Sequence, residues 1–521
     1  MTMNAIGRPT STGAATPPSP PTISGDRGLD HEEPLLFELG RAGVSGVDIP
    51  STEISGRPLG DLRRKGAIGL PGLSEPEIVR HYVRLSRMNY AIDAGLYPLG
   101  SCTMKHNPRL NEKMARLPGF GDLHPLQPQQ TTQGALVLIA ELMRWLTTLT
   151  AMPAVAMSPK AGAHGELCGL LTIRAAVAAR GEKRTRVLVP SSAHGTNPAT
   201  AALAGFSVDE VPAKDDGHVD ADALEKMLGP DVAAIMLTNP NTCGLFEKRV
   251  KEIADAVHKA GAYFYCDGAN FNAIAGRVRP GDLGIDAMHI NLHKTFSTPH
   301  GGGGPGSGPV VLSAALAPFA PLPLLVQDGR GFRLVEDREN VPPGARPFGR
   351  MCAFHGQMGM FVRALAYILS HGADGVRQAS EDAVLAANYI LASLKDTLSA
   401  PFEGPCMHEA LFDDSFLEGT GVSTLDFAKA MIDEGYHPMT MYFPLVVHGA
   451  MLIEPTESES KESLDRFIHV MRALAEEAKA GRLERFAGAP HLAPRRRLDE
   501  TRAARKPVLR WTPKPLPQAA E

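Results

Sequence analysis

The stretch between residues 154 and 312 constrains the fold most, because short apolar runs alternate there with helical patterns. The run at 233–238 is apolar until its last residue, and 247–260 repeats apolar residues every three or four positions. Strands that are apolar throughout are typical of a largely parallel sheet with helices on both faces. We predict strands at 186–190, 206–211, 233–238, 262–266, 287–292 and 309–312, and helices at 136–149, 197–204, 220–228 and 247–260. In such an α/β fold, ligands bind at the carboxyl ends of the strands.

Outside this stretch the chain divides by composition and pattern. Residues 1–28 are rich in Pro, Ser, Thr and Gly, which predicts a disordered tail without the features of a targeting signal. Helical patterns at 358–371 and 376–398 precede strand patterns at 438–447 and 450–453. The predicted regions are a tail at 1–28, an N-terminal arm and interface segment at 29–125, a large domain at 126–340, bridging helices with a small α+β domain at 341–488, and a C-terminal tail at 489–521.

Charge and cysteine content exclude several classes of protein. The 53 Lys and Arg nearly balance the 57 Asp and Glu, so we expect neither a general nucleic-acid binder nor a polybasic membrane-surface protein. The uncharged stretch 298–327 contains four consecutive glycines and six prolines, which exclude a membrane-spanning helix. The six cysteines form no C-x-x-C pair and no zinc-finger spacing. We therefore expect free thiols, no metal site and a bacterial cytoplasmic location.

One lysine has an unusual setting. Lys294 follows the apolar run at 287–292 and precedes the glycine-rich loop 301–308. A lysine at a strand end is usually solvated. Glycines, however, let a ligand approach the backbone, and a partly desolvated lysine is suited to Schiff-base chemistry. The loop is no dinucleotide fingerprint, because a strand pattern rather than a helix follows it.

Three further elements lie at predicted strand ends or helix starts. Asp267 ends an apolar strand and is either a turn cap or the acid that keeps a pyridinium nitrogen protonated. His194 is either a structural hydrogen-bonding residue or a ring that lies over an aromatic cofactor. Gly162 and Ala163 open a helical run, where free amides could bind a phosphate. Together the four elements are stronger evidence than any one alone.

The chain resembles the fold-type I pyridoxal-phosphate enzymes, and more closely the P-protein family of the glycine cleavage system. The matching stretches are 98–105 (PLGSCTMK), 192–198 (SAHGTNP), 267–270 (DGAN), 293–296 (HKTF) and 299–306 (PHGGGGPG). The similarity extends from about residue 30 to the end, including 497–511. It implies a mostly parallel seven-stranded sheet and a smaller α+β C-terminal domain. Some family members are split into two subunits, and this chain resembles the half that carries the cofactor lysine.

The resemblance also implies roles for single residues. Lys294 would be the Schiff-base lysine of pyridoxal 5'-phosphate, Asp267 would pair with the ring nitrogen, and His194 would stack on the ring. The backbone at Gly162 and Ala163 would hold the phosphate. Glycine would lose CO2, and its aminomethyl group would pass to the lipoyl arm of the H-protein. The expected partners are therefore P-protein subunit 1 and lipoylated H-protein, with two copies of each P-protein subunit in the assembly.

Two alternatives remain open on the sequence alone. One is another fold-type I enzyme, such as a bulk amino-acid decarboxylase or a sulfur-mobilising lyase, although the latter needs a mobile nucleophilic cysteine. The other is a non-catalytic scaffold subunit, against which the pair Lys294 and Asp267 argues. The sequence does not place the residues that bind the glycine carboxylate. It also leaves open whether Cys102, Lys105 and His164 lie in the site.

Overall fold

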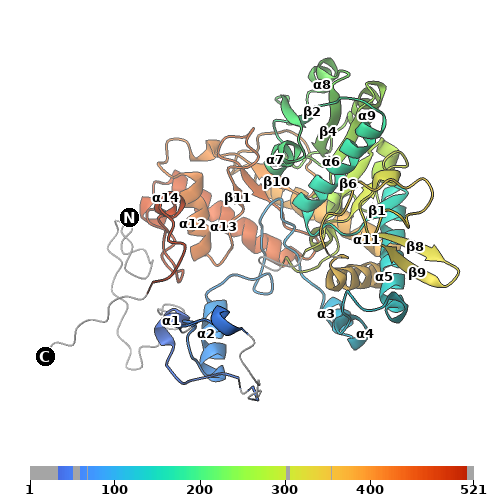
Figure 1. Cartoon of the computed structure of the whole chain (residues 1–521). Helices are drawn as coiled ribbons and strands as arrows, with labels where there is room; N and C mark the ends of the chain where they lie inside the picture. The colour runs from blue at the N-terminus through green and yellow to red at the C-terminus, as the bar shows by residue number, and fades with distance from the viewer. Residues whose placement is uncertain are drawn as a thin grey trace. The chain divides into compact units, whose positions relative to one another are not determined.

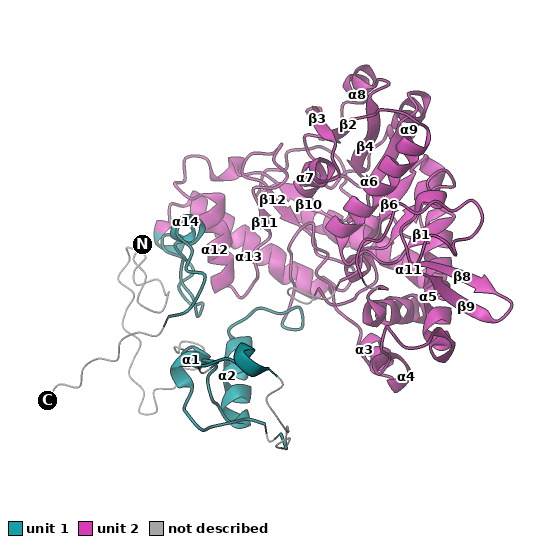
Figure 2. Cartoon of the chain, in the orientation of Figure 1, with its two compact units in different colours: residues 1–94, 484–521 teal, residues 95–483 magenta. Residues whose placement is uncertain are grey.

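We describe a computed structural model of the chain, covering residues 33–47, 49–50, 59–66, 68–300, 306–353 and 355–512. The predicted tail at 1–28 and the glycines 301–304 lie outside these residues. The chain forms two compact units, Met1–Ala94 with Glu484–Glu521 and Gly95–Leu483 (Figure 2). The finer division into five regions stays a prediction.

The larger unit is built on a seven-stranded sheet with the order β1-β7-β6-β5-β4-β2-β3 (Figure 1). Strand β7 is antiparallel to both of its neighbours, and the other strand pairs are parallel. The strands are β1 (Ala154–Ala156), β2 (Arg186–Pro190), β3 (Ser207–Val211), β4 (Val232–Thr238), β5 (Tyr263–Asp267), β6 (Ala287–His289) and β7 (Val310–Leu312). The expected mostly parallel seven-stranded sheet is confirmed.

Both faces of this sheet are buried, which explains the uninterrupted apolar runs. In β4, Ile235 and Leu237 belong to one hydrophobic cluster, whereas Ala234 and Met236 belong to the cluster on the other face. Successive strand side chains point to opposite faces, so each face needs its own helical cover. The first cluster includes residues of α5 (Gln133–Thr150), α8 (Ala221–Met227) and α9 (Val250–Lys259), and the second includes residues of α6 (Gly162–Ala179) and α7 (Thr196–Leu203).

The remaining elements of this unit include a second, smaller sheet, a hairpin and further helices. The three-stranded sheet has the order β10-β12-β11, and β8 pairs with β9 in a hairpin. These strands are β8 (Leu324–Asp328), β9 (Gly331–Val335), β10 (Ala410–Phe412), β11 (Thr440–Met441) and β12 (Met451–Ile453). The helices are α3 (Arg109–Ala115), α4 (Pro118–Gly121), α10 (Leu292–Thr295), α11 (Met358–Leu394), α12 (Thr424–Asp433) and α13 (Lys461–Lys479).

Three predictions differ in detail from the structure. The helices expected at 358–371 and 376–398 are the two parts of α11, which is interrupted at Gly372 with φ +65°. The strand expected at 287–292 ends at His289, and the one-turn helix α10 follows, so Lys294 lies in a helical turn and not at a strand exit. The strand expected at 438–447 is reduced to β11, because Tyr442 has φ +57° and Pro444 has no N–H to donate.

The smaller unit contains α1 (Leu36–Leu39), α2 (Glu75–Arg87) and α14 (Glu500–Arg505). Helix α2 begins with a capping box in which Glu77 accepts a hydrogen bond from the backbone N–H of Ser74 at 2.9 Å. The rings of Phe37 and Trp511 stack with centroids 4.7 Å apart. The two ends of the described chain thus pack together in this unit. In the part of the chain that the structure describes, no helix has both the length and the apolar character to cross a membrane.

Candidate active site

Lys294 lies in the turn that follows β6, at the carboxyl edge of the large sheet. Helix α10 begins after Asn291, whose carbonyl accepts the backbone N–H of Lys294 at 3.0 Å. The side chain is half-buried, and its Nζ donates a hydrogen bond to the backbone oxygen of Ser101 at 2.7 Å. Lys294 therefore has a fixed acceptor from a distant part of the chain.

Asp267 ends β5, the strand next to β6, and is buried with 3% of its surface exposed. Its Oδ2 accepts a hydrogen bond from Asn197 Nδ2 at 2.9 Å, and its Oδ1 accepts the backbone N–H of Ala269 at 2.9 Å. His289 Nε2 lies 3.4 Å from Oδ1. Burial alone would raise the pKa of Asp267, but His289, these two donors and the charge of Lys294 together lower it. The carboxylate is thus held ionised, as a partner for a positively charged ring nitrogen must be.

A second buried acid, Glu166 of α6, shares a donor with Asp267. Asn197 Nδ2 donates to Glu166 Oε2 at 3.0 Å as well as to Asp267, and Thr196 Oγ1 donates to Glu166 Oε1 at 2.8 Å. Burial, and then the charge of Asp267, raise the pKa of Glu166 to about 7. The sequence did not single out Glu166 or Asn197, although Asn197 lies within the quoted motif 192–198 and Glu166 closely follows Gly162 and Ala163.

His194 follows β2 and precedes α7 at the same edge of the sheet. Its Nδ1 lies 3.1 Å from Thr196 Oγ1, and its ring meets Phe443 edge-on with centroids 5.3 Å apart. The imidazole is exposed, so a flat ligand can reach it. Partial burial lowers the pKa of its ring, the charge of Asp267 opposes this shift and that of Lys294 adds to it. His194, Asp267 and Lys294 thus lie at or just after the ends of three strands, at the carboxyl edge of the sheet.

Helix α6 begins beside the end of β6. Its N-cap residue Ala161 has no side-chain cap, and the first-turn amides of an α-helix, here those of Gly162 and Ala163, have no acceptor within the helix. A Cβ on Gly162 would lie 2.9 Å from Asn291 Nδ2 and 3.2 Å from His289 Nε2. Glycine at position 162 lets the backbone lie this close to Asn291 and His289. The backbone N–H groups at the start of the helix can then donate hydrogen bonds to an anion.

The residues around this helix start fit a phosphorylated aromatic cofactor. Among the described residues, the buried atoms Asn291 Oδ1, Ser307 Oγ and Asn270 Oδ1 have no hydrogen-bond partner. Buried polar atoms normally have one, so unpaired atoms at the edge that carries Lys294 indicate a missing ligand. Burial lowers the pKa of His293 to about 3, so its ring is neutral and its Nδ1 accepts the N–H of Ser307 at 3.3 Å.

The segment 98–105 also belongs to this site, which the sequence left open. Lys105 is buried, and its Nζ donates to Thr295 O at 2.9 Å and to Glu457 Oε1 at 2.6 Å. Lys105 is thus an anchor in an ion pair and not a second free amine. Cys102 is half-buried, and burial raises the pKa of its thiol although the charge of Lys294 opposes this. His164 accepts the backbone N–H of Lys160 at 3.2 Å through its Nδ1.

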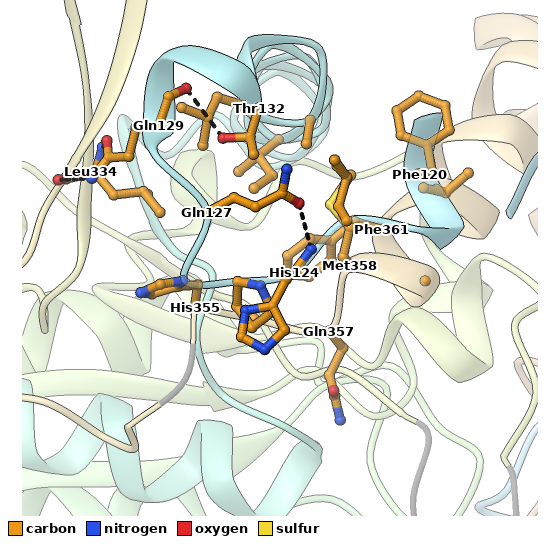
Figure 3. Close-up of a pocket in the computed structure, with 18 of the residues that line it drawn as sticks. Phe120, His124, Gln127, Gln129, Thr132, Leu334, His355, Gln357, Met358 and Phe361 are labelled. Atoms are coloured by element: carbon orange, nitrogen blue, oxygen red, sulfur yellow. Dashed lines mark hydrogen bonds between the residues drawn. The ribbon is translucent and has the colours of Figure 1, made fainter. Parts of the chain in front are cut away.

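A separate cavity of about 700 Å³ lies in the same unit (Figure 3). Apolar side chains such as Phe120, Met358 and Phe361 line it, and Gln127 Oε1 accepts the backbone N–H of His124 at 2.7 Å. None of the five predicted site residues lines this cavity. The described residues that line it include no lysine, so it does not suit the same chemistry.

Several known proteins are similar to this chain in sequence. A glycine dehydrogenase C-terminal domain model matches residues 379–488, and an aminotransferase class-V model matches residues 168–303. A probable glycine dehydrogenase (decarboxylating) subunit 2 of Caulobacter vibrioides is 69% identical over the whole of both chains. A relative of the same description from Desulforamulus reducens is 49% identical over 92% of this chain and 99% of its own length.

Solved structures share the fold. A glycine decarboxylase (P-protein) of the glycine cleavage system superposes with a TM-score of 0.67 at 21% identity, over 80% of this chain and 93% of that one. A cysteine desulfurase of Escherichia coli gives 0.55 at 16% identity, over 74% and 95% of the two chains. The fold-type I architecture expected from the sequence is therefore confirmed, and so is the predicted family. The full-length match at 69% identity shows that this chain belongs to the family of glycine dehydrogenase (decarboxylating) subunit 2 proteins.

Proposed function

We propose that this chain is the cofactor-bearing subunit of a glycine-decarboxylating P-protein, with pyridoxal 5'-phosphate bound at the carboxyl edge of its large sheet. The observation that carries the proposal is that a half-buried Lys294, an ionised and buried Asp267 and the α6 N-terminus, which has no side-chain cap, lie at one edge of the sheet. Family membership makes glycine the substrate of choice. When bound, the cofactor supplies an electron sink for the pair that remains after CO2 leaves.

Each residue has a distinct task in this proposal. Lys294 supplies the amine that links covalently to the cofactor, and Ser101 O holds that amine by a 2.7 Å hydrogen bond. Asp267 keeps the proton on the ring nitrogen, because its lowered pKa leaves a stable negative charge beside that atom. Gly162 and Ala163 bind the phosphate through backbone N–H groups. His194 covers one face of the ring and separates it from water.

The proposed reaction ends with transfer of the aminomethyl group to the lipoyl arm of the H-protein. The term "subunit 2" in the names of the relatives supports a partner subunit 1. We propose an assembly with two copies of each subunit, in which subunit 1 helps to exclude water from the site.

Replacement of Lys294 by Ala tests the assignment. We expect the variant to fold and to retain no cofactor after borohydride treatment and denaturation, whereas the wild-type chain keeps it on the peptide that contains Lys294. Glycine–CO2 exchange with subunit 1 and lipoylated H-protein should fall to background. Cofactor trapped at full occupancy in the variant would show that another amine forms the link. Lys160, an exposed lysine two residues before Gly162, is the matched control when replaced by Ala.

A further inference from the structure

Segment 98–105 reaches Lys294 from the small three-stranded sheet. Leu99 forms a bridge with Ile453 at the end of β12, and Pro98 O accepts the backbone N–H of Glu454 at 3.2 Å. Thr440 Oγ1 donates to Gly100 O at 2.7 Å. The segment is thus tied to the small sheet at several points before it reaches the active site.

Two buried glutamates hold the next three residues. Glu409 directly precedes β10 and Glu454 directly follows β12; because Ala410 pairs with Ile453 in an antiparallel register, the two glutamates are neighbours. Both are fully buried. Glu409 Oε1 accepts the backbone N–H of Ser101 at 2.5 Å. Glu454 accepts the N–H of Thr103 at 2.8 Å and its hydroxyl at 2.5 Å.

The backbone between these contacts is in a conformation that it would not adopt unaided. Ser101 has φ +65° and Thr103 has φ +50°. L-residues rarely adopt this left-handed region, and a β-branched residue such as Thr does so least of all. The two glutamate contacts are made to the N–H groups of these same two residues. The result is that Ser101 O faces Lys294 Nζ at 2.7 Å.

We propose that Glu409 and Glu454 are positioning residues for Lys294, which hold Ser101 and Thr103 in the left-handed conformation so that the Ser101 carbonyl fixes the lysine amine for attack on the cofactor aldehyde. The inference rests on the proposed function. In the attack, the amine nitrogen bonds to the aldehyde carbon, and the oxygen leaves as water with the two protons of the amine. The glutamates take no part in these bonds.

His408 lies beside both acids, and burial lowers the pKa of its ring. It is fully buried, and within the described part of the chain neither of its ring nitrogens has a hydrogen-bond partner. Its Nε2 lies 3.7 Å from Glu409 Oε2 and 3.7 Å from Glu454 Oε1. Burial, and then the charge of Glu454, raise the pKa of Glu409 well above its usual range, while the charge of Lys294 opposes the shift. A raised pKa favours the protonated form of Glu409, in which the oxygen without the proton still accepts the N–H of Ser101.

The experiment follows the capture of pyridoxal phosphate by the cofactor-free chain, with visible absorbance for the rate and induced circular dichroism for the geometry. Glu409→Ala should slow capture about 10-fold or more and weaken the dichroism, because it removes the buried acceptor of the Ser101 backbone N–H. Glu409→Gln keeps an acceptor for Ser101 and should recover most of the rate. Adding Ser101→Gly to Glu409→Ala should also recover part of it, since glycine adopts the left-handed conformation without a Cβ penalty.

The matched control is Asp286→Ala. Asp286 is likewise buried and accepts a backbone N–H, that of Phe264 at 2.9 Å, but it precedes β6 and so lies at the opposite edge of the sheet. This variant should lose thermal stability without slower capture. A native capture rate and native dichroism in Glu409→Ala would overturn the inference, as would slow capture in Glu409→Ala that neither rescue improves.

A second variant and the wild-type chain complete the test. If Glu409→Ala does not fold, Thr103→Val removes the hydroxyl contact to Glu454 and keeps the side-chain shape. We expect capture about threefold slower or worse in that variant, and a native rate would contradict the role of Glu454. Failure of the wild-type chain to capture any cofactor would refute the proposed function itself, which separates the two proposals.

Discussion

Replacement of Glu166 by Gln should remove a pH-dependent loss of stability from the cofactor-free chain. Glu166 lies on α6 with 3% of its surface exposed, and its two oxygens accept from Thr196 and Asn197. Gln keeps the size and can satisfy both neighbours, since its oxygen accepts from the Asn197 amide and its NH2 donates to the Thr196 hydroxyl. The substitution therefore removes the titration and little else.

The magnitude follows from the raised pKa. Burial and the charge of Asp267 move the pKa of Glu166 from 4.5 to about 7, so ionising it in the folded chain costs about 3 kcal/mol more than in the unfolded chain. A raised pKa favours the protonated fold, so this stability is present below about pH 4.5 and is lost as the pH rises through about 7. Between pH 5 and pH 8 the wild-type chain should lose about 2.5 kcal/mol that Glu166→Gln does not lose.

Urea unfolding at the two pH values measures the difference. A Trp511→Phe background leaves Trp145 of α5 as the single tryptophan, so its fluorescence reports the unit that contains Glu166. The exposed Glu225 of α8, replaced by Gln, is the matched control and should follow the wild type. Equal pH dependence of wild type and Glu166→Gln, within about 0.5 kcal/mol, would refute the reasoning. Asp267→Asn should remove only the smaller part of the effect, because burial is the larger cause.

Three further predictions concern the site. Asp267→Asn should retain cofactor but lose about 100-fold or more in CO2 release in single turnovers, because an amide cannot stabilise a charged ring nitrogen; a near-normal rate at saturating glycine would contradict its role. Gly162→Ala should weaken phosphate binding, measured by cofactor titration, because its Cβ would lie 2.9 Å from Asn291 Nδ2, whereas Gly195→Ala meets no atom within 4 Å and is the control. Lys105→Met should cost about 3 kcal/mol in urea unfolding, since it leaves the partly buried Glu457 without its cation, and an unchanged midpoint would show the ion pair to be dispensable.

The parallel sheet was predictable because burial on both faces is visible in the sequence itself. The run that became β4 is buried at every position, and its neighbours Ile235 and Met236 face different clusters. The same reasoning located the carboxyl edge, where Lys294, Asp267 and the start of α6 are found. A topological rule thus brought together residues that are more than a hundred positions apart.

Contacts made by side chains of ordinary type could not be predicted in the same way. Nothing in the sequence around Asn197 or Glu166 marks either as a site residue. Only the structure shows that the Asn197 amide donates to both Glu166 and Asp267. The segment 98–105 has no apolar period from which its conformation could be predicted. That conformation depends on Glu409 and Glu454, more than 300 positions further along the chain. A local pattern carries no information about such a partner. The one available signal was the identity of the motif, which the family resemblance used without explaining it.

The pairing of Asp267 with Glu166 accounts for how a buried carboxylate remains charged. Asp267 and Glu166 accept from the same amide, and two acids this close cannot both be ionised without cost. Their different surroundings shift their two pKa values in opposite directions. Asp267 receives Asn197, the backbone N–H of Ala269 and the nearby His289, and its pKa falls. At Glu166, burial and then the charge of Asp267 outweigh the hydrogen bonds from Asn197 and Thr196, and the pKa rises. Below about pH 7 the proton therefore resides on Glu166, and the negative charge is kept on Asp267, at the end of β5, where a cofactor ring nitrogen would need it.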